Sequence, residues 1–252
     1  MRPGCFFIAL LFFTIPPALA RADQATDIAQ IHLEAIGGRQ RIAALTGLRM
    51  SGVVVVGETR VRFTMIAARP NRVRLETGGN GRTLINATDG EEAPWEFDTG
   101  TWPPRYRAMN EAAAKSFTAD AEFDDPLVAG AARGFTLEYA GETEVDGQKM
   151  LRVLVTRKLA DTFALLLDEE TYFIVLRVEQ RTTAGGRKRQ IITRYDDFRP
   201  VDGILLPHRL TVMTDGRVEQ QMVMEKIETN PEVTPETFTR PKPARSAPPE
   251  NP

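Results

Sequence analysis

The sequence contains very little cysteine and histidine. Cys5 is the only cysteine among the 252 residues, and the two histidines, His32 and His208, lie far apart in the chain. A disulfide needs two cysteines, and the usual zinc sites are built mainly from cysteine and histidine side chains. The composition therefore excludes a disulfide within the chain and argues against a bound zinc ion.

An excess of positive charge is also missing. Lys and Arg number 32 against 34 Asp and Glu, which gives a formal net charge of −2. Domains that bind nucleic acid usually carry a strongly basic patch or stripe. We therefore expect no nucleic-acid partner.

Recognisable catalytic motifs are absent as well. The sequence has no Gly-x-Ser-x-Gly element, Walker loop or dinucleotide fingerprint. Three pairs of adjacent acids are the main catalytic candidates: Asp124-Asp125, Glu169-Glu170 and Asp196-Asp197. Neighbours in a strand point to opposite faces, and Asp125 is placed to cap a helix whose first residue is Pro126. Structural roles are favoured, so we predict a protein that is not an enzyme and uses no cofactor or metal.

The first twenty residues have the pattern of a cleavable signal peptide. Arg2 precedes an uncharged apolar run over residues 5–15, and Ala18-Leu19-Ala20 is a suitable cleavage site. The apolar run is shorter than the roughly 20 residues that a membrane-spanning helix needs, and no later run approaches that length. We expect an exported protein without a transmembrane span after signal cleavage.

Residues 191–213 form the clearest structural signal in the chain. Asp202-Gly203 has the composition of a two-residue hairpin turn, in which both residues adopt positive φ. Strict alternation after the turn places an apolar set on one strand face: Ile204, Leu206, His208, Leu210 and Val212. His208 is the polar exception, and a hydrogen-bonded core histidine is favoured over a catalytic one.

The same period of two recurs along most of the chain. Expected strands cover residues 48–56, 59–67, 71–77, 82–88, 92–98, 135–143, 149–157, 162–168, 172–182, 187–198, 204–213 and 217–227. Apolar side chains on the inner faces of the early strands are Val61, Phe63, Met65, Val73, Leu75, Trp95 and Phe97. This pattern predicts a long antiparallel meander that curls one apolar face inward.

Two segments interrupt the strand pattern. Residues 25–46 are expected to be helical, with a break at Gly37-Gly38. His32 lies on this helix, where a structural role is favoured because the sequence identifies no partner for it. Residues 110–134 are expected to form two short helices, the second capped by Asp125 and ended by Gly134. Their large apolar residues are Phe117, Phe123, Leu127 and Val128. This segment is either a mobile lid over the apolar face or a fixed packing element.

The chain is expected to form a single domain over residues 21–240. Residues 241–252 are rich in proline and serine, which predicts a disordered tail. We expect a monomer.

Four stretches are characteristic as a set, and they begin at His32 (HLEAIGG), Arg69 (RPNRVRL), Asp120 (DAEFDDPLV) and Tyr195 (YDDFRPVDGILLPH). Together they resemble the outer-membrane lipoprotein-sorting family, the LolA/LolB-like periplasmic proteins. The resemblance covers nearly the whole predicted mature chain. It implies a mainly β fold, an unclosed antiparallel barrel of about eleven strands with helices covering its concave face. It also implies periplasmic localisation, a cavity for acyl chains and no catalytic residues.

The sequence therefore favours a periplasmic carrier or binder of lipids or acylated lipoproteins. A membrane-bound donor or acceptor protein is a further candidate partner. The expected ligand-binding residues of cavity and lid are Val61, Phe63, Met65, Val73, Leu75, Trp95, Phe97, Phe117, Phe123, Leu127, Val128, Leu206, His208 and Leu210. Two alternatives stay open at this point. One is an envelope sensor or scaffold that binds a protein partner, and the other is a small-molecule enzyme that would use His208 and Tyr195.

Export gives a first testable prediction. The mature protein should begin near Arg21 and be recovered from the periplasm in soluble form, because Ala18-Leu19-Ala20 provides the cleavage site. Intact-mass measurement of the fractionated protein checks this. Recovery of the uncleaved chain in the membrane fraction would show that the apolar run is a retained anchor.

Overall fold

The computed structural model describes residues 17–79, 81–120, 123–130, 133–157, 162–182 and 186–240. Most of the predicted signal peptide and all of the predicted tail lie outside these ranges. Residues 17–20 belong to the first helix. Within the described part of the chain, none of the helices combines the length and the hydropathy needed to cross a membrane.

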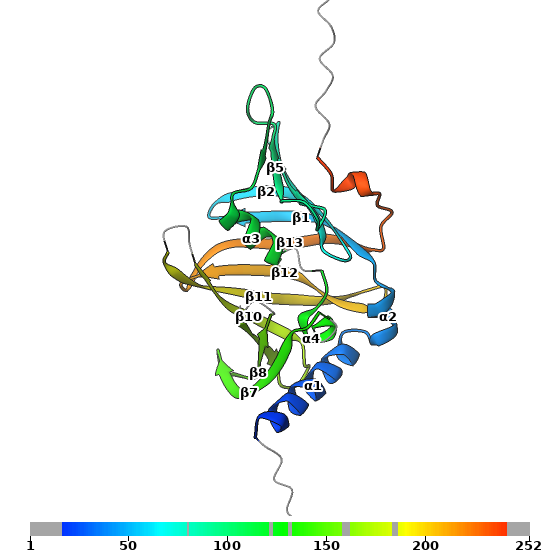
Figure 1. The fold of residues 1–252 in the computed structure, drawn as a ribbon, viewed down its shortest axis with the longest axis vertical. Helices are drawn as coiled ribbons and strands as arrows, with labels where there is room; N and C mark the ends of the chain where they lie inside the picture. Colours follow the sequence, from blue (N-terminus) through cyan, green and yellow to red (C-terminus); the bar gives the residue numbers. More distant parts are fainter. Residues whose placement is uncertain are drawn as a thin grey trace, which may run out of the picture.

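A single antiparallel sheet dominates the fold (Figure 1). Its first six strands are β1 (Gly47–Val56), β2 (Thr59–Ala68), β3 (Arg72–Gly79), β4 (Arg82–Thr88), β5 (Trp95–Asp98) and β6 (Arg105–Ala108). The other seven are β7 (Thr136–Val145), β8 (Gln148–Thr156), β9 (Thr162–Asp168), β10 (Ile174–Thr182), β11 (Lys188–Val201), β12 (Ile204–Thr214) and β13 (Arg217–Thr229).

The strand order explains why the sheet does not close. From β1 the chain adds strands outward to the edge strand β6, crosses to the opposite edge at β7, and returns strand by strand to β13, which pairs with β1. The edges β6 and β7 do not pair with each other. The mainly β, unclosed antiparallel fold is therefore confirmed, with thirteen described strands in place of about eleven.

The strand that sequence analysis missed is β6. Its four residues are all exposed, so they carry no alternation between a buried and a solvated face. Hydrogen bonding to β5 through the pair Trp95 and Ala108 is what makes this segment a strand. A short edge strand without a buried face leaves no periodic signal.

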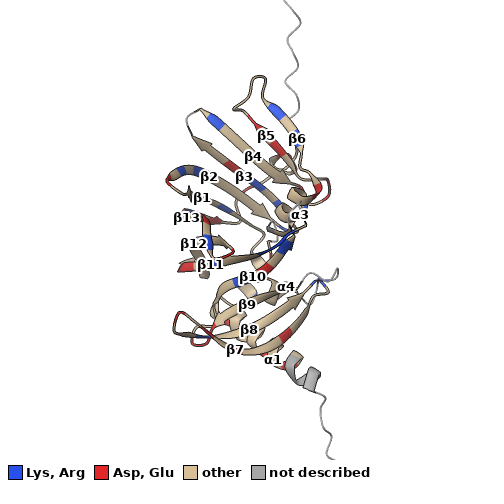
Figure 2. Ribbon diagram, turned by 90° about the vertical axis from the view of Figure 1, so that its left-hand side faces the viewer, with Lys and Arg blue, Asp and Glu red and all other residues tan. Residues whose placement is uncertain are grey.

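Helices cover one face of the sheet. They are α1 (Pro17–Ala35), α2 (Arg39–Ala44), α3 (Glu111–Asp120) and α4 (Pro126–Ala129), and a 3₁₀ turn follows β13 at Pro235–Thr237. In both ribbon views α3 and α4 lie on the same side of the strands, and α1 runs beside β7 at the lower end (Figures 1 and 2). The break at Gly37-Gly38 is confirmed. Helix α4 ends at Ala129 rather than near Gly134. The chain turns after it, and the Phe135 N–H donates a hydrogen bond to the Gly130 carbonyl.

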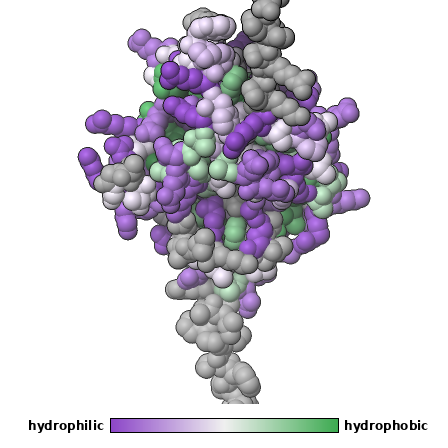
Figure 3. All heavy atoms as spheres, turned by 45° about the horizontal axis from the view of Figure 1, so that its top comes forward, coloured by the Kyte–Doolittle hydropathy of each residue, from purple (hydrophilic) through white to green (hydrophobic). Residues whose placement is uncertain are grey.

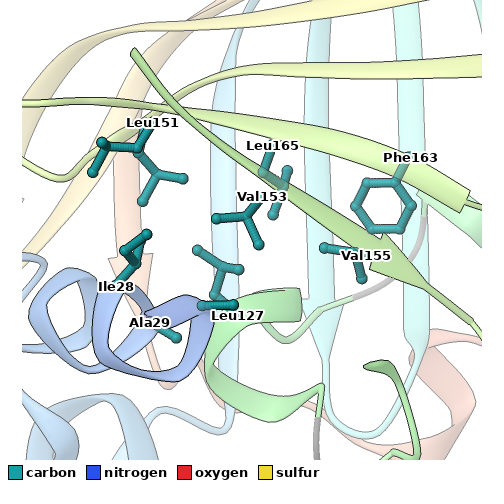
Figure 4. Close-up of a cluster of buried hydrophobic side chains, with 10 residues drawn as sticks. Ile28, Ala29, Leu127, Leu151, Val153, Val155, Phe163 and Leu165 are labelled. Carbon is teal, nitrogen blue, oxygen red and sulfur yellow. The ribbon is translucent and has the colours of Figure 1, made fainter. Parts of the chain in front are cut away.

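The main core lies between these helices and the strands β8 and β9. Ile28 of α1 and Leu127 of α4 face Val153, Val155 and Leu165 of the sheet, all of which are buried (Figure 4). Fully burying one aliphatic side chain contributes about 1.5–3 kcal/mol. This cluster fixes where α1 and α4 sit on the sheet.

The hairpin turn predicted at Asp202-Gly203 is confirmed. Both residues have positive φ, 48° and 79°, as the two-residue turn requires. The turn is joined to the end of α1, because the Leu205 N–H donates to the Ile36 carbonyl at 2.8 Å. A Cβ on Gly37 would lie 2.7 Å from the Gly203 carbonyl oxygen, so this close approach needs a glycine at position 37.

Alternation on β2 gives the second prediction. Phe63 is 3% exposed, whereas the Arg62 side chain is 75% exposed and contacts Glu225 at 2.7 Å. Phe63→Glu should lower the free energy of unfolding by several kcal/mol, because it buries an unpaired carboxylate. Arg62→Glu should cost about 1 kcal/mol or less, as expected for an exposed ion pair. Urea unfolding of the two variants checks the contrast, and equal losses would show that this face assignment is wrong.

Candidate functional site

A cavity of about 250 Å³ lies where α1, α2 and the segment before α4 meet the sheet. Apolar side chains make most of its wall: Ile36, Ile42, Leu45, Leu48, Phe123, Leu165, Ile174, Phe198, Ile204, Leu205 and Leu206. Its polar members are His32, Arg69, Asp124, Asp125, Arg177 and Tyr195. The volume is slightly below the roughly 300–1,000 Å³ of drug-sized ligand sites. As it stands, the cavity suits a small or slender apolar group.

His32 connects α1 to two other segments across this cavity. Its Nε2 atom lies 3.1 Å from Oδ2 of Asp125, and its Nδ1 atom lies 2.7 Å from the Tyr172 carbonyl oxygen. The Tyr172 carbonyl only accepts hydrogen bonds, and so does the Asp125 carboxylate when it is ionised. With Asp125 ionised, both ring nitrogens donate and His32 is the cationic imidazolium.

Electrostatics agrees with this protonation state. Burial opposes the charge on His32, but the nearby Asp125 carboxylate, its hydrogen bond and the Tyr172 carbonyl outweigh burial and raise the His32 pKa above 6.5. Burial likewise favours protonated Asp125, yet the His32 charge and the backbone N–H groups of Leu127 and Val128 lower the pKa of Asp125 below 3.8. The pair is therefore ionised at mildly acidic pH.

Asp125 has a second role at the start of α4. Its Oδ1 atom accepts a hydrogen bond from the Leu127 N–H at 2.8 Å, and Pro126 follows as the first helical residue. The predicted helix cap is thus confirmed. One carboxylate both caps α4 and holds His32, so the position of α4 depends on α1.

Arg69 makes the parallel connection on the other side of the same segment. Its Nε donates to Asp124 Oδ1 at 2.6 Å, and its terminal nitrogens donate to the Ala43 and Ile42 carbonyls at 3.0 Å each. Its guanidinium also lies 5.5 Å from the centre of the Phe123 ring, within cation–π range. Residues 123–126, which we call the latch segment, are therefore held from two sides by His32 and Arg69.

A second charged group ties α3 to the sheet. Glu179 of β10 is 9% exposed and lies between Arg177, at 3.2 Å, and Arg181. Arg181 also donates to Ser116 Oγ of α3 at 2.7 Å. Arg177 stacks 4.5 Å from the centre of the Phe163 ring. Among the described residues, no group of three or more His, Cys, Asp and Glu side chains could hold a metal ion.

The structure distributes the sequence-predicted ligand residues among several places. Phe123 and Leu206 line the cavity. Met65, Val73, Phe117 and Phe123 pack with Ala67 in a separate cluster, Trp95 and Phe97 belong to another with Ile85, and Leu127 is part of the main core. Phe63 and His208 are buried, with His208 Nδ1 3.0 Å from the Leu206 carbonyl oxygen. Val61, Leu75, Val128 and Leu210 are half-buried.

His32 and Arg69, the two side chains that hold the latch segment, were not among the ligand residues predicted from the sequence. For His32 the sequence identified no partner, and the structure supplies two, Asp125 and the Tyr172 carbonyl. Arg69 was not selected at all. A signal for both was present, since each of the four stretches that carry the family resemblance contributes to the cavity wall, through His32, Arg69, the latch segment and Tyr195.

Comparison with known proteins identifies the fold. No family model matches the chain, and no curated protein matches it. Among solved structures, a DUF1329 family protein from Desulfovibrio piger has 10% identity and a TM-score of 0.58, covering 87% of this chain and 97% of that one. A presumed outer membrane lipoprotein-sorting protein domain from Vibrio parahaemolyticus has 9% identity and a TM-score of 0.58, covering 86% and 97%. A LolA superfamily protein from Nitrosomonas europaea has 12% identity and a TM-score of 0.51, covering 87% and 98%.

The His32–Asp125 pair gives a prediction about pH. Because the His32 pKa is raised, its contribution to stability is complete below pH 6.5 and is lost as pH rises through the folded-state pKa. Because the Asp125 pKa is lowered, its contribution is present above pH 3.8 and is lost as pH falls through its folded-state value. The pair should stabilise the fold most between these two limits.

Asp125→Asn separates the charge from the helix cap, since asparagine is also a good N-cap residue. At about pH 6 the substitution should lower the free energy of unfolding by about 2 kcal/mol, the value of a hydrogen bond to a charged group. The difference from wild type should shrink as the pH is raised to about 9. Urea unfolding across this pH range checks the prediction, and a difference that does not change with pH would contradict it.

Proposed function

From a fold shared with LolA superfamily structures, we propose that this protein is a periplasmic carrier that holds an acyl chain of a lipid or lipidated protein, without a chemical step. The observation that carries the proposal is the apolar cavity whose wall includes the ion-paired latch segment. The solved lipoprotein-sorting domain of the same fold supports this class of cargo. Binding of this kind needs apolar walls, which the cavity supplies, and a way in, for which the latch segment is our candidate.

The energetics of acyl binding fit such walls. Each buried CH₂ group contributes about 0.8 kcal/mol, so a few methylenes suffice to offset opening of the latch. In the closed form, a cavity of about 250 Å³ accommodates part of a chain. A complete acyl chain needs more space than this form offers.

Phe123 is placed to provide that space. It lines the cavity and also packs against the neighbouring apolar cluster that contains Met65, Val73 and Phe117. Displacing the latch segment removes Phe123 from between them and joins the two apolar regions into one longer site. In this proposal, residues 110–134 act as the lid that sequence analysis considered.

His32 and Arg69 set the resistance to opening. Each holds one of two adjacent carboxylates, at 3.1 and 2.6 Å, and a hydrogen bond to a charged group contributes about 1.5–3 kcal/mol. The barrier from these contacts is therefore a few kcal/mol, which cargo entry can offset. In this proposal the carrier opens by breaking these polar contacts and displacing Phe123, while the main core between α1, α4 and the sheet stays packed.

Arg69→Ala tests the proposed gate. Loss of one charged contact should speed uptake of a fluorescent fatty acid by about tenfold or more, the factor that corresponds to about 1.4 kcal/mol. Arg62→Ala is the matched control, because it removes an exposed arginine of β2 that also contacts a single carboxylate, Glu225. Stopped-flow fluorescence measures the uptake rates.

The two parts of the proposal fail in different ways. If fatty acid binds but both variants take it up at the wild-type rate, the latch does not control entry. If neither wild type nor variant binds fatty acids or lipopeptides, the carrier function itself is wrong.

A further inference from the structure

Trp102 has no role in the cavity, yet it is the most exposed large apolar side chain of the described residues. Its exposed fraction is 93%, whereas the other tryptophan, Trp95, is 3% exposed and donates its indole N–H to the Phe238 carbonyl at 3.1 Å. Trp102 lies in the turn between β5 and β6, which is the outer edge of the sheet. The β5–β6 hairpin projects at the top of the molecule in both ribbon views (Figures 1 and 2).

The turn that carries Trp102 is held by local contacts. The Gly100 N–H donates to Asp98 Oδ1 at 2.7 Å, and Thr101 Oγ1 donates to the Pro103 carbonyl at 3.1 Å. Asp98 also accepts two hydrogen bonds from Arg82, at 3.1 and 2.7 Å. An indole that an ordered turn holds in water does not gain the free energy that burial would contribute. We therefore expect Trp102 to contact a molecule outside the chain.

The residues around Trp102 have the composition of a membrane-interface site. Pro103 and Pro104 follow it, both exposed, and neither has a backbone N–H to desolvate. Exposed arginines flank the turn, Arg82 at the start of β4 and Arg105 and Arg107 on β6. Tryptophan favours the headgroup region of a bilayer, and basic residues near an anionic surface add electrostatic attraction.

The charge balance favours an anionic surface. Asp98 is paired with Arg82 and Glu96 with Arg107, and Arg105 makes no ion pair within the described part of the chain. Basic positions on β4 and β6 lie in the same upper region as the hairpin (Figure 2). The turn thus combines an exposed indole with an arginine excess.

A protein partner fits these observations less well. Tryptophan hot spots in protein interfaces lie inside a broad patch whose surrounding residues exclude water. Most visible side chains on the face shown in Figure 3 are hydrophilic, and the apolar ones form small separate areas. Trp102 is flanked by exposed residues on a turn rather than set within such a patch.

We propose that the β5–β6 hairpin docks the protein on an anionic lipid surface, with Trp102 inserted at headgroup depth and Arg105 beside the phosphates. The inference is independent of the cavity and of any cargo. It gives the molecule a defined contact with a bilayer although no described helix could span one.

Intrinsic fluorescence tests the proposal directly, because the sequence contains only two tryptophans. Vesicles of phosphatidylcholine mixed with phosphatidylglycerol should shift the emission of the wild-type protein to shorter wavelength, and brominated lipids should quench it. Trp102→Ala should lose both effects, since the tryptophan that is left is buried. Vesicle co-sedimentation of this variant should be about tenfold weaker, as expected for the loss of one buried aromatic side chain.

Two further variants make the test specific. Arg105→Glu should weaken binding to anionic vesicles by about fivefold or more, the factor that corresponds to about 1 kcal/mol. Val218→Ala is the matched control, because Val218 is 64% exposed on a different hairpin, and it should bind like wild type. Unchanged wild-type emission in the presence of vesicles would overturn the proposal. Undiminished binding of Trp102→Ala would also overturn it, as would binding that does not depend on lipid charge.

Discussion

An open antiparallel sheet cannot cover its own apolar face, and most of this structure follows from that constraint. The strands β6 and β7 end the sheet without pairing to each other, so the concave side must be covered by other segments. Helix α1 and the crossover between β6 and β7 provide that cover, and their apolar residues form the main core with β8 and β9. The covering segments that pack their apolar side chains against the strands form the main core. The cavity lies beside the latch segment, which ion pairs hold in place.

The proposed opening of the carrier relies on the contrast between these two kinds of contact. Ile28 and Leu127 fix α1 and α4 through buried apolar surface, which is lost only if the fold is disrupted. The latch segment depends on His32 and Arg69, whose hydrogen bonds are few and directional. In the proposed carrier, opening breaks these hydrogen bonds and moves Phe123 away from its apolar neighbours, while the main core stays packed.

Local sequence rules predicted most elements. Asp202-Gly203 adopts the expected turn because its φ angles depend on the two residues themselves, and Asp125 caps α4 because the cap acts on the helix that directly follows. The alternation around Phe63 was also correct about which side is buried. The sequence carries no signal where a segment has no buried face, as in β6, or where a partner lies far along the chain, as for His32.

The sequence by itself determined the period of the strands, the positions of the turns and the breaks between helices, because these depend on backbone preferences within a few residues. It also determined, through four separate stretches, which parts of the chain resemble a known fold. Only the tertiary structure decided that His32 meets Asp125, that Arg69 meets Asp124, and that Trp102 stays exposed while Trp95 is buried. Those outcomes depend on which distant segments the return of β13 to β1 brings together, and no local preference contains that information.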